Sequence, residues 1–171
     1  DRRVRFIEDA DQRIREDYLR TLRFFRFSAW YGAIDQGFDP DALNAISSNL
    51  DGLETLSAER VGMEMVKLLN ATDPAVAVAV MRQTGVLNAV LQGADDTWLA
   101  PLIHVESLWN LSPDPIRRLA ALGGTGVEKT LRLSKAQVRL LVQYRDGIGS
   151  MAGVGELGYR LGADVAKGIV A

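Results

Sequence analysis

Two side chains near the start of the chain have the chemistry to recognise the edge of a nucleotide base. They are Asp17 and Arg20, in the arginine-rich segment 13–27, RIREDYLRTLRFFRF. A carboxylate only accepts hydrogen bonds, and a guanidinium group only donates them. Residues three apart on a helix lie on the same face. We therefore expect the two side chains to present an acceptor beside a donor.

Such an edge complements two of the four bases. Cytosine and adenine carry an amino group beside a ring nitrogen that accepts, whereas guanine and uracil carry a carbonyl and an N–H at those places. A carboxylate accepts readily from the cytosine amino group, and each buried polar group left unpaired costs about 1–3 kcal/mol. The alternative is that Glu16–Arg20 and Asp17–Arg20 are ordinary surface ion pairs of a helix, each worth about 0.2–0.5 kcal/mol. Spacing alone favours that alternative.

Composition excludes several other kinds of site. The 171 residues are 47% apolar and 25% charged, as in a folded protein, and the net charge of −2 does not by itself indicate nucleic-acid binding. Cysteine is absent, which excludes disulfides and thiolate metal sites, and His104 is the only histidine, which argues against a Ser-His-Asp triad or a multi-histidine metal site. No apolar run reaches the roughly 20 residues needed to span a membrane. We expect a cytoplasmic protein.

Arginine is concentrated in the first part of the chain. All basic residues among the first 32 are arginine, and the first lysine is Lys67. A guanidinium fork matches a phosphate group or a base edge, whereas lysine is a point charge. GC-rich coding would produce the same bias, so both explanations stay open. The adjacent pair Arg117 and Arg118 is a weaker indication of phosphate contact.

Apolar spacing and capping residues predict an all-α fold. The apolar side chains of Ile14, Tyr18, Leu22, Phe25 and Ala29 predict one helix over 13–31. Further helices are expected at 41–49, 57–70, 97–110, 115–122, 134–145 and 154–169. The alternating AVAVAV of 75–80 favours a helix, because Asp-Pro precedes it and a glycine follows. For Trp98 and Trp109, packing in a core or interface is favoured over base stacking, and for His104 a surface or structural role is favoured over a chemical one.

The segment 13–27, followed by SAWYG, resembles the neck-helix signature of the bacterial class II tRNA nucleotidyltransferase (CCA-adding enzyme) and poly(A) polymerase family. That signature is EDxxR followed by LRxxRF, matched here by Glu16, Asp17, Arg20, Leu22, Arg23, Arg26 and Phe27. LSAERVGMEMVKLL (56–69) resembles the next family motif through Ser57, Glu59, Arg60, Glu64, Lys67, Leu68 and Leu69. The resemblance covers about residues 4–92. Glu8-Asp9 replaces the glycine-aspartate pair usual before the neck helix.

The resemblance implies a role for each of these residues. Asp17 and Arg20 would read incoming CTP or ATP as a protein template, and Glu16 would orient Arg20. Glu59 and Arg60 would belong to the motif that braces the first one. The last two candidates, Arg23 and Arg26, would serve in structural pairing or phosphate contact.

The resemblance also implies that the two halves of the chain have different roles. Residues 1–88 would form the neck and 89–171 the RNA-binding body, with tRNA or another RNA 3′ end as partner. Family catalysis uses a carboxylate pair and two Mg²⁺ ions in a head domain that has no counterpart here. We therefore expect a neck and body fragment that is inactive alone, has no catalytic residue and binds no metal. The alternative is a noncatalytic helical module that binds RNA or protein. Whether the parent activity is CCA, CC, A or poly(A) addition stays open, as does the oligomeric state.

Overall fold

The computed structural model describes residues 3–33 and 36–148. Its helices are α1 (Ala10–Glu16), α2 (Leu19–Tyr31), α3 (Pro40–Ser48), the 3-10 helix η2 (Leu50–Thr55), α4 (Ala58–Leu69), α5 (Ala75–Gln83), α6 (Val86–Val90), α7 (Leu99–Leu108), α8 (Pro115–Leu122), α9 (Val127–Thr130) and α10 (Lys135–Gly147). No β-strand occurs within the described ranges, where a single isolated bridge joins Ala94 and Gly123. The all-α prediction is confirmed, and the helix expected at 154–169 lies outside the described residues.

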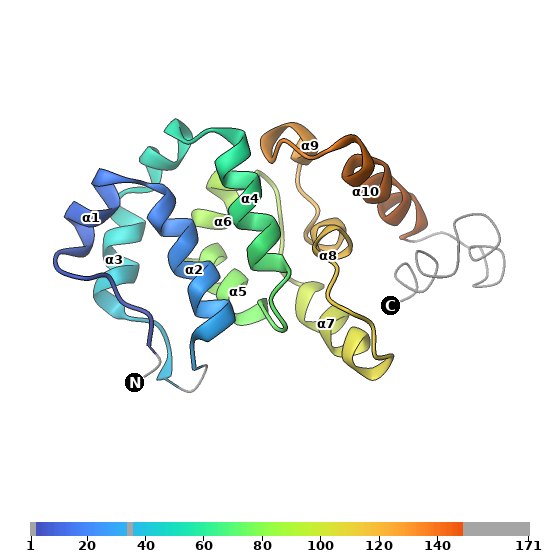
Figure 1. Ribbon diagram of the computed structural model, residues 1–171, viewed down its shortest axis with the longest axis horizontal. Coiled ribbons are helices and arrows are strands. Elements are labelled where there is room, and N and C mark those ends of the chain that lie inside the picture. The colour runs from blue at the N-terminus through green and yellow to red at the C-terminus, as the bar shows by residue number, and fades with distance from the viewer. Residues whose placement is uncertain (1–2, 34–35, 149–171) are drawn as a thin grey trace.

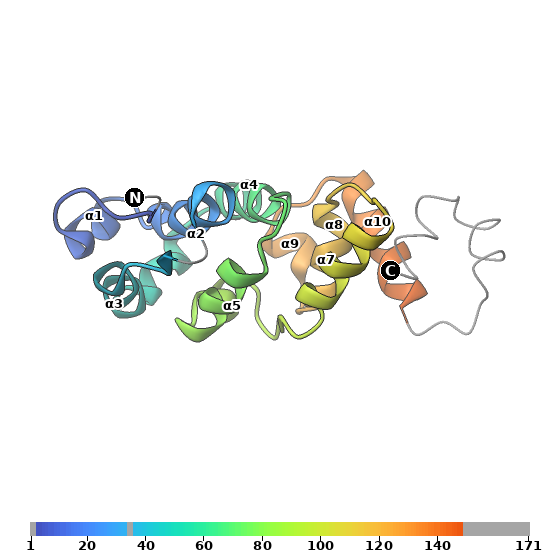
Figure 2. The ribbon, with the colours of Figure 1, turned by 90° about the horizontal axis from the view of Figure 1, so that it is seen from below.

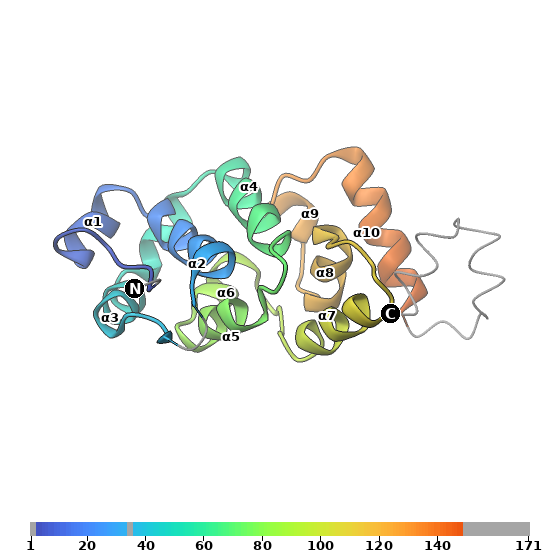
Figure 3. The ribbon, with the colours of Figure 1, turned by 60° about the horizontal axis from the view of Figure 1, so that its bottom comes forward.

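The helices follow the long axis of the molecule in approximate chain order, from α1 near the N-terminus to α10 (Figure 1). In the first half, α1, α2 and α4 form one layer, and α3 and α5 form a second layer beneath them (Figure 2). Helices α2 and α4 pack side by side, an arrangement that is also visible in Figure 3. This pairing brings the two sequence motifs into contact, because the first runs from the end of α1 into α2 and the second lies on α4.

Short polar side chains cap α1, α3, α4, α8 and α10. Ser57 caps α4 and Asp114 caps α8, each through its side-chain oxygen. Ser134 and Gln137 form a capping box at the start of α10. Gly85 adopts a left-handed backbone with φ of 85° between α5 and α6, which confirms that AVAVAV lies in a helix ended by this glycine.

The single helix predicted over 13–31 is wrong. The chain leaves the helical conformation at Asp17, whose φ of −156° and ψ of 101° are extended, so that α1 ends at Glu16 and α2 starts at Leu19. The Asp17 side chain explains the break, because its Oδ1 accepts from the backbone nitrogen of Leu19 at 3.2 Å and replaces a helical bond. Asp17 and Arg20 are therefore not neighbours on one helix face.

One hydrophobic cluster continues through most of the described chain. It includes Phe25 of α2, Met65 of α4, Leu87 of α6, Leu119 of α8 and Leu141 of α10. This cluster crosses residue 88, where the sequence predicts the boundary between two subdomains. The division into 1–88 and 89–171 stays a prediction.

A buried ionic cluster fastens α7 and α8 to the end of α4. Arg118 is 1% exposed and donates to Glu106 Oε2 at 2.7 Å and to the backbone oxygens of Leu69 and Ala71. Arg117, 7% exposed, donates to Glu106 Oε1 at 2.8 Å. The indication that Arg117 and Arg118 contact phosphate is wrong, because both guanidinium groups are buried against a carboxylate.

The two tryptophans flank α7 and lie at the surface, with exposed fractions of 69% for Trp98 and 48% for Trp109. Packing in a core, one of the two interpretations favoured for them, is therefore wrong, and packing in an interface stays a prediction. His104 is also exposed. No helix within the described ranges has the length and apolar character needed to cross a membrane.

Candidate functional site

Asp17 lies at the break between α1 and α2, where a residue of the second motif holds it. Arg60 Nη2 on α4 is 3.0 Å from Asp17 Oδ1 and 3.1 Å from Oδ2. Arg23 Nη1 approaches Oδ2 to 3.9 Å. The carboxylate is a quarter exposed, so it is oriented by its neighbours without being buried.

Arg20 is held on the other side of the same break. Its Nη1 donates to Glu16 Oε2 at 2.6 Å and to the backbone oxygen of Arg13 at 2.7 Å. Arg13 Nη1 also donates to Glu16 Oε2, at 2.7 Å. Among the ion pairs of the described residues, none joins Asp17 to Arg20. The two side chains are thus anchored separately and do not neutralise each other.

The hydrogen bond from Arg20 has an electrostatic consequence. Together with the nearby charges of Arg13 and Arg20, it lowers the pKa of Glu16, although partial desolvation opposes the shift. Glu16 consequently stays charged under mildly acidic conditions. Its position beside Arg20 is the one that an orienting role requires.

Arg23 and Arg26 share a carboxylate that lies beneath them. Glu64 of α4 is 6% exposed, and its Oε2 is 2.7 Å from Arg26 Nε while its Oε1 is 3.7 Å from Arg23 Nε. A buried carboxylate needs such a partner, because an isolated buried charge is costly. Structural pairing is therefore present for both arginines, and Arg23 remains 43% exposed and accessible to a ligand.

The ion pairs of this region join more arginines than acids. Arg13, Arg20, Arg23, Arg26 and Arg60 pair with Glu16, Asp17 and Glu64. The local charge is positive in a chain whose net charge is −2. This surface therefore favours an anionic ligand even though the whole molecule does not.

An open hollow of about 240 Å³ lies beside Arg20. Arg13, Arg20, Arg23, Phe24 and Phe27 line it from α1 and α2, and the segment 4–7 lines it from the other side. Phe6 stacks on Phe24 with ring centroids 5.4 Å apart, which fixes that segment against α2. The hollow combines guanidinium donors with aromatic surface.

The structure brings most, but not all, of the predicted residues together. Glu59 points elsewhere and pairs with Arg132 at 3.5 Å. Arg13 and Glu64 belong to the cluster although neither was among the predicted site residues. The spacing of Arg13 and Glu16, three residues apart, could have identified the first, and the second motif contains Glu64.

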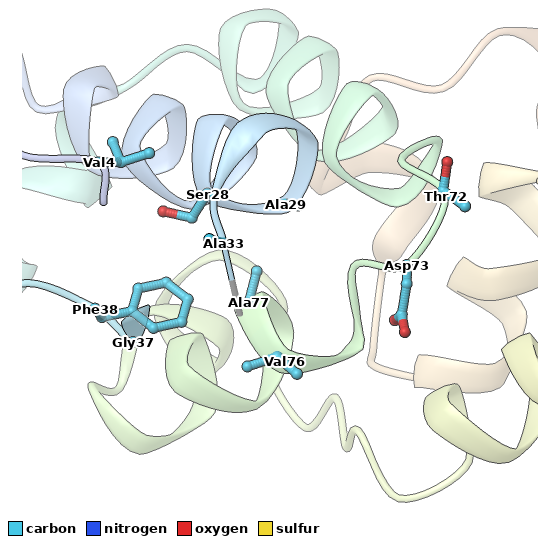
Figure 4. A pocket seen from close by; sticks show the side chains of 11 residues that line it. Val4, Ser28, Ala29, Ala33, Gly37, Phe38, Thr72, Asp73, Val76 and Ala77 are labelled. Atoms are coloured by element: carbon cyan, nitrogen blue, oxygen red, sulfur yellow. The ribbon is translucent and has the colours of Figure 1, made fainter. Parts of the chain in front are cut away.

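A second hollow, of about 200 Å³, lies between α2 and α5. Figure 4 shows Ser28 and Ala29 of α2 facing Val76 and Ala77 of α5. Its polar side chains bond to nearby backbone, because Ser28 Oγ donates to Phe24 O and Asp73 Oδ1 accepts from Ala75 N. This hollow offers little chemistry compared with the one beside Arg20.

The described residues contain no group of three His, Cys, Asp or Glu side chains able to hold a metal ion. The acids of the site, Glu16, Asp17 and Glu64, are all paired with arginine.

An all-helical surface with paired arginines beside an aromatic hollow is suited to a nucleic-acid ligand. A family model described as "Probable RNA and SrmB-binding site of polymerase A" matches residues 37–97, which contain α3 to α6 and therefore Arg60.

Curated relatives agree with this match. The CCA tRNA nucleotidyltransferase 1, mitochondrial, of Danio rerio is 31% identical over 156 residues, covering 84% of this chain and 35% of the relative. Its Homo sapiens counterpart is 48% identical over 71 residues, covering 40% of this chain and 16% of the relative. The CCA-adding enzyme of Geobacillus stearothermophilus is 40% identical over 90 residues, covering 53% of this chain and 21% of the relative.

This chain belongs to the CCA-adding enzyme and poly(A) polymerase family. It spans about a third or less of the length of the three relatives described above. The resemblance noted in the sequence is confirmed.

Proposed function

We propose that this chain supplies the base-selecting and RNA-positioning part of a tRNA nucleotidyltransferase. Asp17 and Arg20 select CTP and ATP, and the remaining helices hold the 3′ end of the RNA. The observation that supports this proposal most directly is the separate anchoring of the two side chains, Asp17 by Arg60 and Arg20 by Glu16.

The anchoring leaves hydrogen-bonding capacity for a base. The hydrogen bonds of the Arg20 side chain to Glu16 and to the Arg13 carbonyl both use Nη1, which leaves Nε and Nη2 as donors for a ring acceptor. A carboxylate has about four lone-pair sites, and Asp17 accepts from Leu19 N and Arg60 Nη2. Its remaining capacity suits the amino group of cytosine or adenine. Guanine and uracil present a carbonyl there and are repelled.

The hollow is lined by Arg20 but not by Asp17, and its size supports a base and not a complete nucleotide as its occupant. Its volume of about 240 Å³ is below the roughly 300–1,000 Å³ of a typical small-molecule site. The triphosphate and the catalytic Mg²⁺ ions would be held by a separate catalytic domain, as the family resemblance implies. Under this proposal the chain alone adds no nucleotide, and it acts in the cytoplasm.

A titration of the 171-residue chain with each of the four nucleoside triphosphates, followed by ¹⁵N NMR at the Arg20 Nε–H, tests this proposal. We expect CTP and ATP to shift that signal at lower concentration than GTP and UTP, and Arg20→Lys to abolish the difference, because lysine lacks the planar fork. An equal response to all four nucleotides would contradict base selection. If the chain responds equally to all four nucleotides and also binds RNA with an affinity that falls steeply with salt, the alternative of a noncatalytic RNA-binding module is favoured.

A further inference from the structure

On one side of α2, two exposed aromatic side chains follow the arginines of the base-selecting site. Arg20, Arg23, Phe27 and Tyr31 follow one another at spacings of three, four and four residues, which places them along one side of the helix. Phe27 is 38% exposed and Tyr31 65% exposed, which are high values for aromatic rings. These four residues form what we call the α2 face.

Contacts within the molecule hold this face in place. The Phe27 and Tyr31 ring centroids are 6.0 Å apart, with 34° between the ring planes. Arg26 Cζ lies 4.4 Å from the Phe27 ring centroid, so a cation covers part of that ring. At the same end of α2, Trp30 Nε1 donates to the backbone oxygen of Lys67 at 2.8 Å, which fixes α2 against α4.

We propose that the α2 face is the stacking platform for the single-stranded 3′ end of the RNA. Bases stack on Tyr31 and Phe27, and Arg23 contacts the backbone phosphates. This inference rests on the proposed function, because it takes the base read by Asp17 and Arg20 as the end point of the strand. Proteins that hold single strands combine aromatic rings with a positively charged groove in this way.

The distance along α2 from Arg20 to Tyr31 suits a short single strand of RNA. Arg20 and Tyr31 are eleven residues apart, which corresponds to roughly 16 Å along a helix at 1.5 Å per residue. A stacked strand advances about 3.4 Å per nucleotide, so about four to five nucleotides cover the distance. The selected base and the last nucleotides of the RNA thus fit one continuous surface.

Charge complementarity favours RNA over another protein as the occupant. The arginines of the paired cluster exceed its acids, and Arg23 is 43% exposed. The exposed tryptophans Trp98 and Trp109 provide a contrast, because α7 between them contains neither lysine nor arginine. Aromatic exposure occurs at both places, but excess positive charge accompanies it on α2.

Fluorescence anisotropy of the 171-residue chain with a 5′-labelled, ten-nucleotide single-stranded RNA tests this inference. Because stacking on one aromatic ring is worth about 1–3 kcal/mol, Tyr31→Ala should weaken binding roughly fivefold to 100-fold, whereas Tyr31→Phe should stay close to wild type. Trp98→Ala is the matched control and should leave the Kd unchanged. Arg23→Gln should reduce the salt slope of binding by about one, and thermal unfolding of each variant verifies that the fold is retained.

Three outcomes would overturn the stacking platform: no binding by the wild-type chain at low salt, an unchanged Kd for Tyr31→Ala, or a loss for Trp98→Ala as large as that for Tyr31→Ala. An unchanged RNA Kd for Tyr31→Ala would favour a protein domain instead of RNA as the occupant of the α2 face. The proposed function fails on a different result, an equal response of Arg20 to all four nucleotides, so the two failures are distinguishable.

Discussion

Arg60 on α4 holds the Asp17 carboxylate at the break between α1 and α2, with its Nη2 3.0 Å from Oδ1 and 3.1 Å from Oδ2. The two residues are 43 positions apart in the sequence. The contact joins the two motifs physically and pairs the carboxylate with Arg60, whereas Arg20 pairs with Glu16. Base selection in our account depends on this separation.

Replacement of Arg60 should therefore affect selectivity more than stability. In Arg60→Ala the Asp17 carboxylate is released and can pair with Arg20, which removes the acceptor–donor edge. Because the Arg60 side chain is 47% exposed, the free energy of unfolding should change by less than about 1 kcal/mol. Urea unfolding and the NMR titration with CTP and UTP measure the two effects. Arg132→Ala is the control, and selectivity retained in Arg60→Ala would argue against the bracing role.

The ionisation of Glu16 provides a second prediction. The hydrogen bond from Arg20 lowers the pKa of Glu16, so Arg20→Gln should raise it toward its usual value. Arg13→Gln should raise it less, because the contribution of Arg13 is smaller. A lowered pKa in the folded state adds stability above the usual glutamate range, and this contribution is lost as the pH falls through the folded value. Carboxyl ¹³C NMR titration of the wild type, Arg20→Gln and Arg13→Gln measures the pKa of Glu16 in each protein. Identical pKa values would contradict the pairing of Glu16 with Arg20.

The buried cluster between α4, α7 and α8 should be sensitive to the loss of one partner. Arg118→Ala leaves Glu106 with a single guanidinium partner and frees the carbonyls of Leu69 and Ala71. Breaking a buried ion pair in this way costs about 3–5 kcal/mol. Urea unfolding measures the cost, with exposed Arg139→Ala as the control. A loss below about 1 kcal/mol would show that the cluster contributes little to stability.

A close approach of α4 to the end of α9 predicts a strict requirement for glycine at position 62. A Cβ atom at Gly62 would overlap the backbone carbonyl oxygen of Leu131. Gly62→Ala should therefore destabilise the fold by about 1–3 kcal/mol, although alanine is the better helix former. Thermal unfolding checks this, with exposed Met63→Ala as the control. Equal stability of Gly62→Ala and the wild type would mean that α4 and α9 separate easily.

Local signals predicted the helices well. The bounds 115–122 of α8 and the capping box of α10 follow from residues close in sequence, namely Asp114, Ser134 and Gln137. The helix break at Asp17 could not be predicted in this way, because Ile14 and Tyr18 continue the apolar spacing across it. The break depends on the side chain of Asp17 and on Arg60, which is distant in the sequence.

In the site too, contacts between residues close in sequence could be predicted, whereas contacts between distant residues could not. The pairing of Glu16 with Arg20 could be expected from a spacing of four residues, whereas the contact of Asp17 with Arg60 depends on how α2 packs against α4. Arg117 and Arg118 look like a surface charge pair in the sequence. Their burial depends on Glu106 and on carbonyls of the α4 end, none of which local spacing identifies.

The most direct test of base selection exchanges the carboxylate of Asp17 for an amide. The chain is joined to the preceding part of the Geobacillus stearothermophilus CCA-adding enzyme, and incorporation of CTP and UTP into a tRNA substrate is compared for the wild-type chimera and its Asp17→Asn variant. Because an asparagine amide also donates hydrogen bonds, the CTP-to-UTP ratio should fall roughly fivefold to 150-fold, which corresponds to the about 1–3 kcal/mol of one mismatched polar contact. An unchanged ratio in an active Asp17→Asn chimera would contradict the protein-template account.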